Sequence, residues 1–153
     1  MRPCIGIRRE DKSPWERRVP LVPFDVADLI SSHGIEVAVQ PSANRVFADA
    51  DYRDAGAWID EELHDCPVIL GVKEIPVALL RPATTYIFFS HVIKGQAYNM
   101  PMLRRLKELR CNLIDYERVT DDHGRRLIFF GRYAGIAGAI ETLWALGQRL
   151  KIE

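Results

Sequence analysis

The stretches Val68-Ile-Leu-Gly-Val-Lys-Glu74 and Thr85-Tyr-Ile-Phe-Phe-Ser-His91 decide how we interpret the fold. Each begins with a short run of β-branched, aliphatic or aromatic residues, which is typical of a strand buried on both faces of a parallel sheet. We therefore predict strands over 68–72 and 85–89. Each run ends directly before a polar pair, Lys73-Glu74 after the first and Ser90-His91 after the second.

The ends of these two strands are the best candidates for a functional site. Ligands of open α/β sheets bind at the carboxyl ends of the strands, so Lys73 and His91 are expected at the same edge of the sheet. A lysine and a histidine in that place can share proton transfer. The pattern leaves an alternative open, in which Lys73 is a surface residue and His91 only makes hydrogen bonds within its loop.

The rest of the chain alternates between strand and helix patterns. We predict further strands over 4–8, 35–39, 112–114 and 126–130, helices over 23–33, 48–57, 58–65, 99–110 and 131–150, and a helical turn over 76–80. Alternation at this spacing predicts an α/β domain with a doubly wound, mostly parallel sheet of the flavodoxin or Rossmann type, with helices on both faces.

Composition limits the class of protein. The 153 residues suffice for one domain, and 21 basic side chains balance 21 acidic ones, so the electrostatic footprint of a nucleic-acid-binding protein is missing. No apolar run reaches the length of a membrane span. The N-terminal residues also lack the continuous apolar segment that is typical of a signal peptide. Cys4, Cys66 and Cys111 are an odd, widely spaced set that fits neither a disulfide framework nor a zinc site. A reduced, cytoplasmic protein is the simplest interpretation.

Glycines near the C-terminus raise the question of a nucleotide site. Gly131, Gly135 and Gly138 precede or open the last predicted helix, but their spacing is not that of G-x-G-x-x-G, because Arg132-Tyr133-Ala134 separate the first two glycines. The sequence therefore predicts no dinucleotide-binding loop. The four histidines show no metal spacing, so no metal site is predicted. Arg18 could hold a carboxylate with its guanidinium fork, although a solvated arginine is the simpler alternative.

Seven motifs, in order along nearly the whole chain, resemble one enzyme family. They are Ile7-Arg-Arg-Glu-Asp-Lys12, Trp15-Glu-Arg-Arg-Val-Pro-Leu21, Val39-Gln-Pro-Ser42, Gly71-Val-Lys73, Phe88-Phe-Ser-His91, Leu113-Ile-Asp-Tyr-Glu117 and Phe130-Gly-Arg-Tyr-Ala-Gly-Ile-Ala-Gly138. The chain is similar to the N-terminal domain shared by alanine dehydrogenases, transhydrogenases and saccharopine dehydrogenases. It most resembles the lysine–ketoglutarate reductase part of aminoadipic semialdehyde synthases.

The resemblance implies roles for individual residues. Enzymes of this group join lysine and 2-oxoglutarate through an imine that a nicotinamide cofactor reduces to saccharopine. By position in the motifs, Lys73 and His91 would be the acid–base pair, and Arg18 would hold a substrate carboxylate. The remaining substrate-binding residues implied in the same cleft are Glu74, Lys94 and Glu117.

The resemblance also implies a domain organisation. Family enzymes bind NAD(P) on a second, Rossmann-type domain, so residues 1–134 would be the substrate-side domain and residues 135–153 a helix that bridges to a domain absent from this chain. We expect that Rossmann domain in cis or in trans, no tight cofactor binding by this chain, and no turnover by the chain alone. The alternatives are an alanine-dehydrogenase-like half enzyme and a non-catalytic domain that binds an amino acid or a keto acid.

Overall fold

The computed structural model describes residues 3–151, which form two compact units that divide between Arg118 and Val119. The first unit holds all six strands and the site, and the second holds one long helix. Each unit is described by itself.

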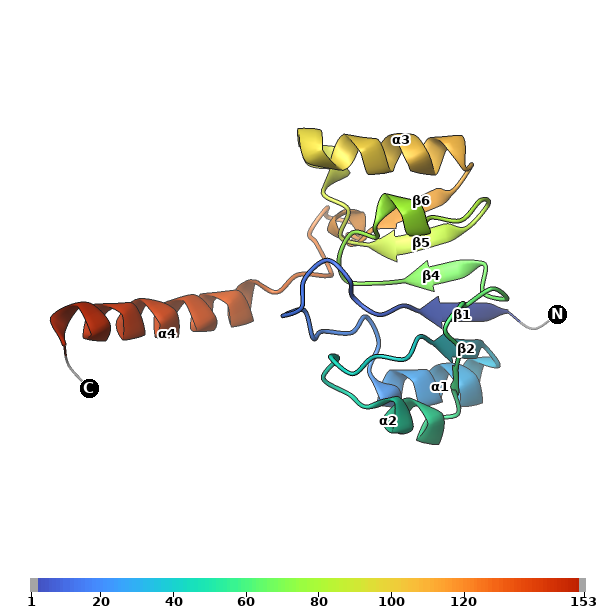
Figure 1. The fold of residues 1–153 in the computed structure, drawn as a ribbon, viewed down its shortest axis with the longest axis horizontal. Coiled ribbons are helices and arrows are strands. Elements are labelled where there is room, and N and C mark those ends of the chain that lie inside the picture. Colours follow the sequence, from blue (N-terminus) through green and yellow to red (C-terminus); the bar gives the residue numbers. More distant parts are fainter. Residues whose placement is uncertain (1–2, 152–153) are drawn as a thin grey trace. The chain divides into compact units, whose positions relative to one another are not determined.

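The first unit is built on one parallel sheet (Figure 1). Its strands are β1 (Cys4–Ile7), β2 (Glu36–Val39), β3 (Trp58–Ile59), β4 (Val68–Leu70), β5 (Thr85–Phe88) and β6 (Asn112–Asp115). Their spatial order is β3-β2-β1-β4-β5-β6, and every pairing is parallel. This is the strand order of doubly wound Rossmann sheets. The order in which strands are added to the sheet reverses between β1 and β4, although all strands run in the same direction. The predicted α/β fold class is confirmed.

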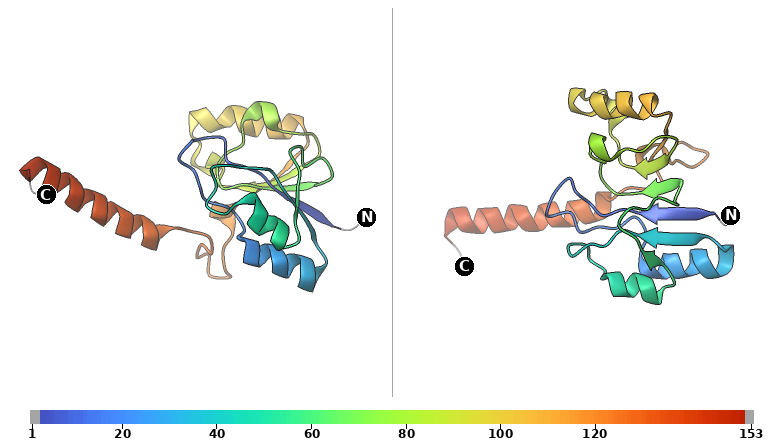
Figure 2. Two further views of the ribbon diagram at one scale, coloured as in Figure 1. Left: turned by 60° about the horizontal axis from the view of Figure 1, so that its bottom comes forward. Right: turned by 45° about the vertical axis from the view of Figure 1, so that its right-hand side comes forward.

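Helices cover the sheet as the doubly wound pattern requires (Figure 2). They are α1 (Pro23–His33), α2 (Asp49–Asp54) and α3 (Met100–Glu108), with a short 3-10 turn, η1 (Val77–Leu79), in the crossover between β4 and β5. The end of α1 follows from the sequence, because Gly34 adopts the left-handed conformation (φ 64°) that glycine permits at a helix C-terminus.

Two hydrophobic clusters lie on opposite faces of the sheet, as the alternating register of β2 shows. Val37 and Val39 belong to the cluster under α1 and α2, whereas Ala38 between them belongs to the cluster under α3. The first cluster is completed by Ile7, Val26, Tyr52 and Ala57, and the second contains Ile69, Tyr86, Phe88, Met102 and Leu106 among others. Burial on both faces explains why the strands are continuous apolar runs.

Two of the predicted elements are wrong. Residues 58–65 were expected to be a helix, but Trp58 and Ile59 form β3, which pairs with Ala38 and Val39 of β2. A two-residue strand has no periodicity of its own, and its pairing partner decides its conformation. Residues 126–130 form no strand, and only an isolated antiparallel bridge joins Thr120 to Arg126.

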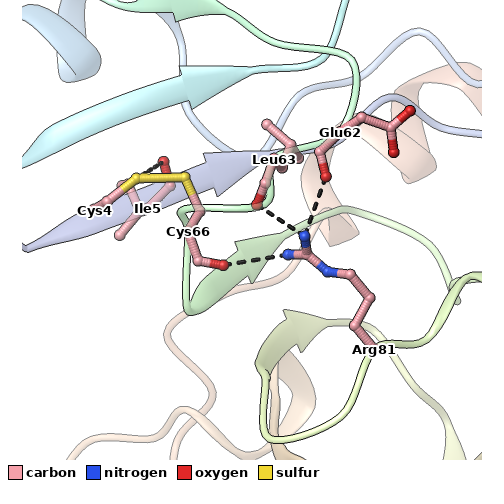
Figure 3. Close-up of a disulfide and its surroundings, with 6 residues drawn as sticks. All are labelled: Cys4, Ile5, Glu62, Leu63, Cys66 and Arg81. Atoms are coloured by element: carbon pink, nitrogen blue, oxygen red, sulfur yellow. Dashed lines mark hydrogen bonds between the residues drawn. A yellow bond between two sulfur atoms is a disulfide. The ribbon is translucent and has the colours of Figure 1, made fainter.

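The structure joins Cys4 and Cys66 by a disulfide, so the expectation of no disulfide is wrong for this pair (Figure 3). The two residues are 62 positions apart in sequence, but Cys4 begins β1 and Cys66 lies just before the adjacent strand β4. The pairing of Ile5 with Val68 therefore brings the two cysteines together. The guanidinium of Arg81 donates to the backbone carbonyls of Glu62, Leu63 and Cys66 and so holds the loop that carries Cys66. Cys111 is a free thiol.

The second unit, Val119–Glu153, contains α4 (Gly131–Leu150). Its apolar side chains Ile140, Leu143 and Trp144 are between 61% and 69% exposed. Between residues 3 and 151, the helices are all too short or too polar to cross a bilayer.

Candidate functional site

The site lies at the carboxyl edge of the sheet, beside the switch between β1 and β4. The loop after β1 and the turn after β4 meet there. Arg8 N–H donates to Leu70 O (3.0 Å), and Lys12 Nζ lies 2.6 Å from Glu74 Oε2. Lys73, between these contacts, is partly exposed. This is where ligands bind in doubly wound sheets.

His91 is part of a compact cluster of charged groups. Its Nδ1 lies 3.4 Å from Glu117 Oε2 and 3.2 Å from Lys94 Nζ, and Lys94 Nζ lies 2.9 Å from Glu117 Oε1. Lys94 closes a 3-10 turn after β5, and Glu117 lies in a 3-10 turn after β6. The Glu117 side chain is only 5% exposed, so its carboxylate is a fixed partner that can orient the imidazole ring.

The turn that presents His91 is held by a buried pair. His91 itself adopts a left-handed backbone conformation (φ 54°), which is rare for residues other than glycine. The hydroxyl of Ser90, which is fully buried, donates to Asp115 Oδ2, and Asp115 Oδ1 accepts from the Glu117 N–H (2.9 Å). Asp115 therefore joins the turn after β5 to the turn after β6, which keeps His91 and Glu117 together.

Lys73 faces a separate set of neighbours. A pocket of about 380 Å³ is lined by Lys12, Ser13, Trp15, Glu16 and Lys73. Arg18 binds Glu16 through both of its carboxylate oxygens, with Nε 2.8 Å from Oε1 and Nη2 2.6 Å from Oε2. The hydrogen bond from Arg18 is the main reason why the pKa of Glu16 lies below its ordinary value. The fork of Arg18 thus has the geometry for a carboxylate, and here it holds Glu16.

A single buried amide connects the Lys73 turn with the His91 turn. Asn99 Nδ2 donates to the carbonyl of Ser90 (2.8 Å) and lies 3.4 Å from Glu74 Oε1. The backbone adds a second link, because the Phe89 N–H donates to Val72 O (3.1 Å).

The predicted site residues thus divide into two connected groups. The structure brings His91, Lys94 and Glu117 into contact. Lys73 instead lines a pocket together with Glu16, the residue that Arg18 binds. The catalytic and binding roles of these residues stay predictions. Among the described residues 3–151, no group of histidine, cysteine, aspartate and glutamate side chains could hold a metal ion.

Sequence reasoning missed three supporting residues: Glu10, Asn99 and Asp115. Asn99 lies at the N-cap position of α3, but its side chain makes no capping bond and reaches partners 9 and 25 residues away. Partners so distant leave no local pattern.

The pH dependence of stability should reveal the Glu74 contact. Burial acts to raise the pKa of Glu74, but the hydrogen bonds from Lys12, from its own backbone N–H and from Asn99, together with the charge of Lys12, outweigh it, so this pKa lies below its ordinary value. A carboxyl whose pKa is lowered by folding stabilises the fold above its unfolded pKa, and that contribution is lost as pH falls through its folded pKa. We expect E74Q to lose less stability than the original chain between about pH 5 and pH 3 in urea unfolding. E141Q, at an exposed position of α4, is the control, and equal slopes for E74Q and the original chain would contradict the assignment.

Comparison with protein families gives one match over most of the chain. Residues 6–137 match the family described as alanine dehydrogenase/PNT, N-terminal domain. The chain is 44% identical over 152 residues to an alpha-aminoadipic semialdehyde synthase of Arabidopsis thaliana, which covers 95% of this chain and 14% of that protein. It is 36% identical over 152 residues to a saccharopine dehydrogenase [NAD(+), L-lysine-forming] of Yarrowia lipolytica, covering 94% of this chain and 40% of that protein. The chain therefore spans well under half of the length of these relatives.

Solved structures support the fold. An L-alanine dehydrogenase superposes with a TM-score of 0.65 at 24% identity, over 79% of this chain and 34% of the other. A transhydrogenase from Sinorhizobium meliloti superposes with a TM-score of 0.64 at 20% identity, over 78% of this chain and 36% of the other. Both agree with the doubly wound sheet.

Proposed function

Because this chain belongs to the alanine dehydrogenase/PNT N-terminal domain family, we propose that it is the substrate-binding and proton-transferring domain of an NAD(P)-dependent oxidoreductase of lysine metabolism, acting on lysine, 2-oxoglutarate and saccharopine. The cluster of His91, Lys94 and the buried Glu117 at the carboxyl edge of the sheet is the observation that carries the proposal. The names of the most similar relatives, which include a semialdehyde synthase and saccharopine dehydrogenases, support the substrate class.

In this proposal each side chain has a distinct task. Arg18 releases Glu16 and binds a substrate carboxylate with the same two-bond geometry. Lys73 and His91 transfer protons to and from the nitrogen and oxygen atoms that react when the amine of lysine condenses with the keto group. Glu117 orients the His91 ring, and Glu74 and Lys94 line the cleft.

The residues of this chain do not fit a bound dinucleotide. In doubly wound sheets the pyrophosphate lies at the first βα turn, on glycines and the N-terminus of a helix. Here that turn is long, and Glu10 directs a partly buried carboxylate to the backbone N–H groups at the switch point. A negative charge there would repel phosphate. We therefore assign NAD(P) to a Rossmann domain of the complete enzyme, in cis or in trans, and assign α4, with its exposed apolar side chains, to the bridge into that domain.

Cofactor titration tests this assignment. Calorimetry of the chain with NADH and with NADPH is expected to show no binding tighter than about millimolar, which corresponds to roughly −4 kcal/mol. The reason is the missing phosphate-binding loop together with the charge of Glu10. Micromolar binding of either cofactor would contradict it.

Substrate titration tests the proposed function. In NMR spectra of the ¹⁵N-labelled chain, the addition of saccharopine or 2-oxoglutarate should shift the backbone amide signals of Lys73, His91 and Glu117. R18A should weaken binding roughly 10- to 100-fold, because charge-assisted hydrogen bonds contribute about 1.5–3 kcal/mol. R17A is the matched control, because the neighbouring Arg17 donates to the backbone carbonyl of Asn44 instead. Binding of pyruvate alone would favour the alanine-dehydrogenase-like alternative, and no binding at these residues would overturn the proposal.

A further inference from the structure

The turn that carries Lys73 lies just beyond the backbone ladder of the sheet. On the side of β1 the last backbone bond runs from Arg8 N–H to Leu70 O (3.0 Å), whereas on the side of β5 the Gly71 N–H still donates to Ile87 O (3.0 Å). After Arg8 the chain leaves the sheet as a loop. The next N–H groups on that side of β4 therefore have no strand to pair with, and buried N–H groups need an acceptor.

The side chain of Glu10 supplies that acceptor. Its Oε1 accepts from the Val72 N–H (2.6 Å), and its Oε2 accepts from the Lys73 N–H (2.9 Å). On the other side of the turn, Val72 O accepts from Phe89 N–H (3.1 Å). A carboxylate thus continues the pairing of β1 with β4 where the backbone of β1 has departed, and the backbone of Lys73 is fixed from both neighbouring segments.

The sequence around the turn is compatible with this contact. Val72 is 3% exposed, so its N–H depends on a protein partner. At Gly71, a Cβ would lie at ordinary van der Waals distance from Glu10 Oε1 (3.4 Å) and from Arg8 Cγ (3.7 Å), so the carboxylate packs directly against this position.

We propose that Glu10 is the positioning residue of Lys73: its two carboxylate oxygens fix the two backbone N–H groups that set the direction in which the lysine side chain enters the site. This role rests on the proposed function, because it concerns the residue to which proton transfer is assigned. Glu10 acts through Lys73 and does not itself contact the substrate.

The bidentate contact distinguishes glutamate from its closest analogue. A glutamine has nearly the same size but offers one acceptor oxygen instead of two. E10Q can therefore keep one of the two bonds and E10A neither. The matched control is E61Q, because Glu61 also pairs with an arginine of the loop after β1, with Arg9 Nη2 2.5 Å from Oε1, but it makes no contact with the Lys73 turn.

Amide hydrogen exchange in the ¹⁵N-labelled chain measures the contact directly. We expect the protection of the Val72 and Lys73 amides to fall at least tenfold in E10A and by less in E10Q, while the amides of Leu70 and Ile87 keep theirs. E61Q should leave all four unchanged. If E10A does not fold, the protection of the same two amides in E10Q decides whether Glu10 holds them. Unchanged protection at both amides, or an equal fall across the whole sheet, would overturn the proposal.

A pH titration provides a readout that a general loss of packing would not reproduce. Burial raises the pKa of Glu10; its bonds from Val72 and Lys73 and the charge of Arg8 lower it, and Glu16 raises it, with a net upward shift. The amide protons of Val72 and Lys73 should therefore shift together, with one midpoint above the ordinary value of a glutamate. In E10Q this common transition should vanish, and its persistence there would overturn the proposal.

Substrate binding separates this inference from the proposed function. If the original chain binds saccharopine, E10Q should weaken binding at least fivefold and E61Q should not, and equal affinities of E10Q and the original chain would overturn the positioning role. If the original chain binds no substrate, the proposed function fails, while exchange and titration still decide whether Glu10 fixes the Lys73 turn.

Discussion

Replacing the lysine or the histidine of the proposed acid–base pair is expected to reduce turnover by roughly two to four powers of ten, the usual contribution of general acid–base catalysis. The measurement needs a complete enzyme. The mitochondrial alpha-aminoadipic semialdehyde synthase of Bos taurus, 43% identical over 146 residues, is suitable. The substitutions are made at the residues that match Lys73 and His91, and kcat is measured with saturating substrates.

The choice of variant follows from the local structure. K73M keeps the length of the side chain and removes the ammonium group. H91N is preferable to H91A, because the backbone at His91 is left-handed and asparagine tolerates that conformation better than most residues. In the isolated chain, both variants should keep the urea midpoint of unfolding, since Lys73 and His91 are partly exposed.

Combining the two substitutions shows whether the pair acts as a unit. If Lys73 and His91 share one proton-transfer task, the double variant should lose little more activity than the worse single variant, because groups that act together are strongly non-additive. A loss below tenfold in either single variant, with folding intact, would contradict the assignment of that residue to proton transfer.

The sheet could be predicted from the sequence because its central strands are buried on both faces. The runs at 68–72 and 85–89 are short, apolar and rich in β-branched and aromatic residues, which favours a buried parallel strand, and the structure contains β4 and β5 there. The edge strand β3 could not be predicted, since Trp58 and Ile59 are extended only through their pairing with β2. Prediction thus succeeded where local sequence determines burial and failed where a distant partner decides.

The site follows the same rule. The positions of Lys73 and His91 could be predicted from strand ends alone, since parallel strands end at a common edge. Contacts between segments far apart in sequence left no such signal. Cys4 and Cys66 are separated by 62 residues, and Asp115 reaches Ser90 across 25. Such contacts become visible only once the strand order is known, because that order brings the ends of β1, β4, β5 and β6 together.

The contact between Asp115 and Ser90 leads to the largest expected effect on stability. Asp115 is 8% exposed, and its two oxygens accept from the Ser90 hydroxyl and from the Glu117 N–H. D115A leaves both buried donors without their acceptor, and each such loss costs about 1–3 kcal/mol. We therefore expect D115A to lower the free energy of unfolding by about 2–6 kcal/mol, measured by urea denaturation.

Two further variants separate the two bonds of Asp115. D115N keeps an acceptor oxygen for the Glu117 N–H but weakens the bond from Ser90, so it should cost less than D115A. Adding S90A to D115A should cost less than S90A alone, because the hydroxyl has already lost the acceptor of its proton and keeps only its bond from the Val92 N–H (3.3 Å). D65N, at an exposed aspartate, serves as the control. Since Asp115 joins the turns that carry His91 and Glu117, D115A should also shift the backbone signal of His91, whereas D65N should not. If the costs of S90A and D115A simply add, the two side chains stabilise the fold independently, and the turn of His91 must be held by other contacts.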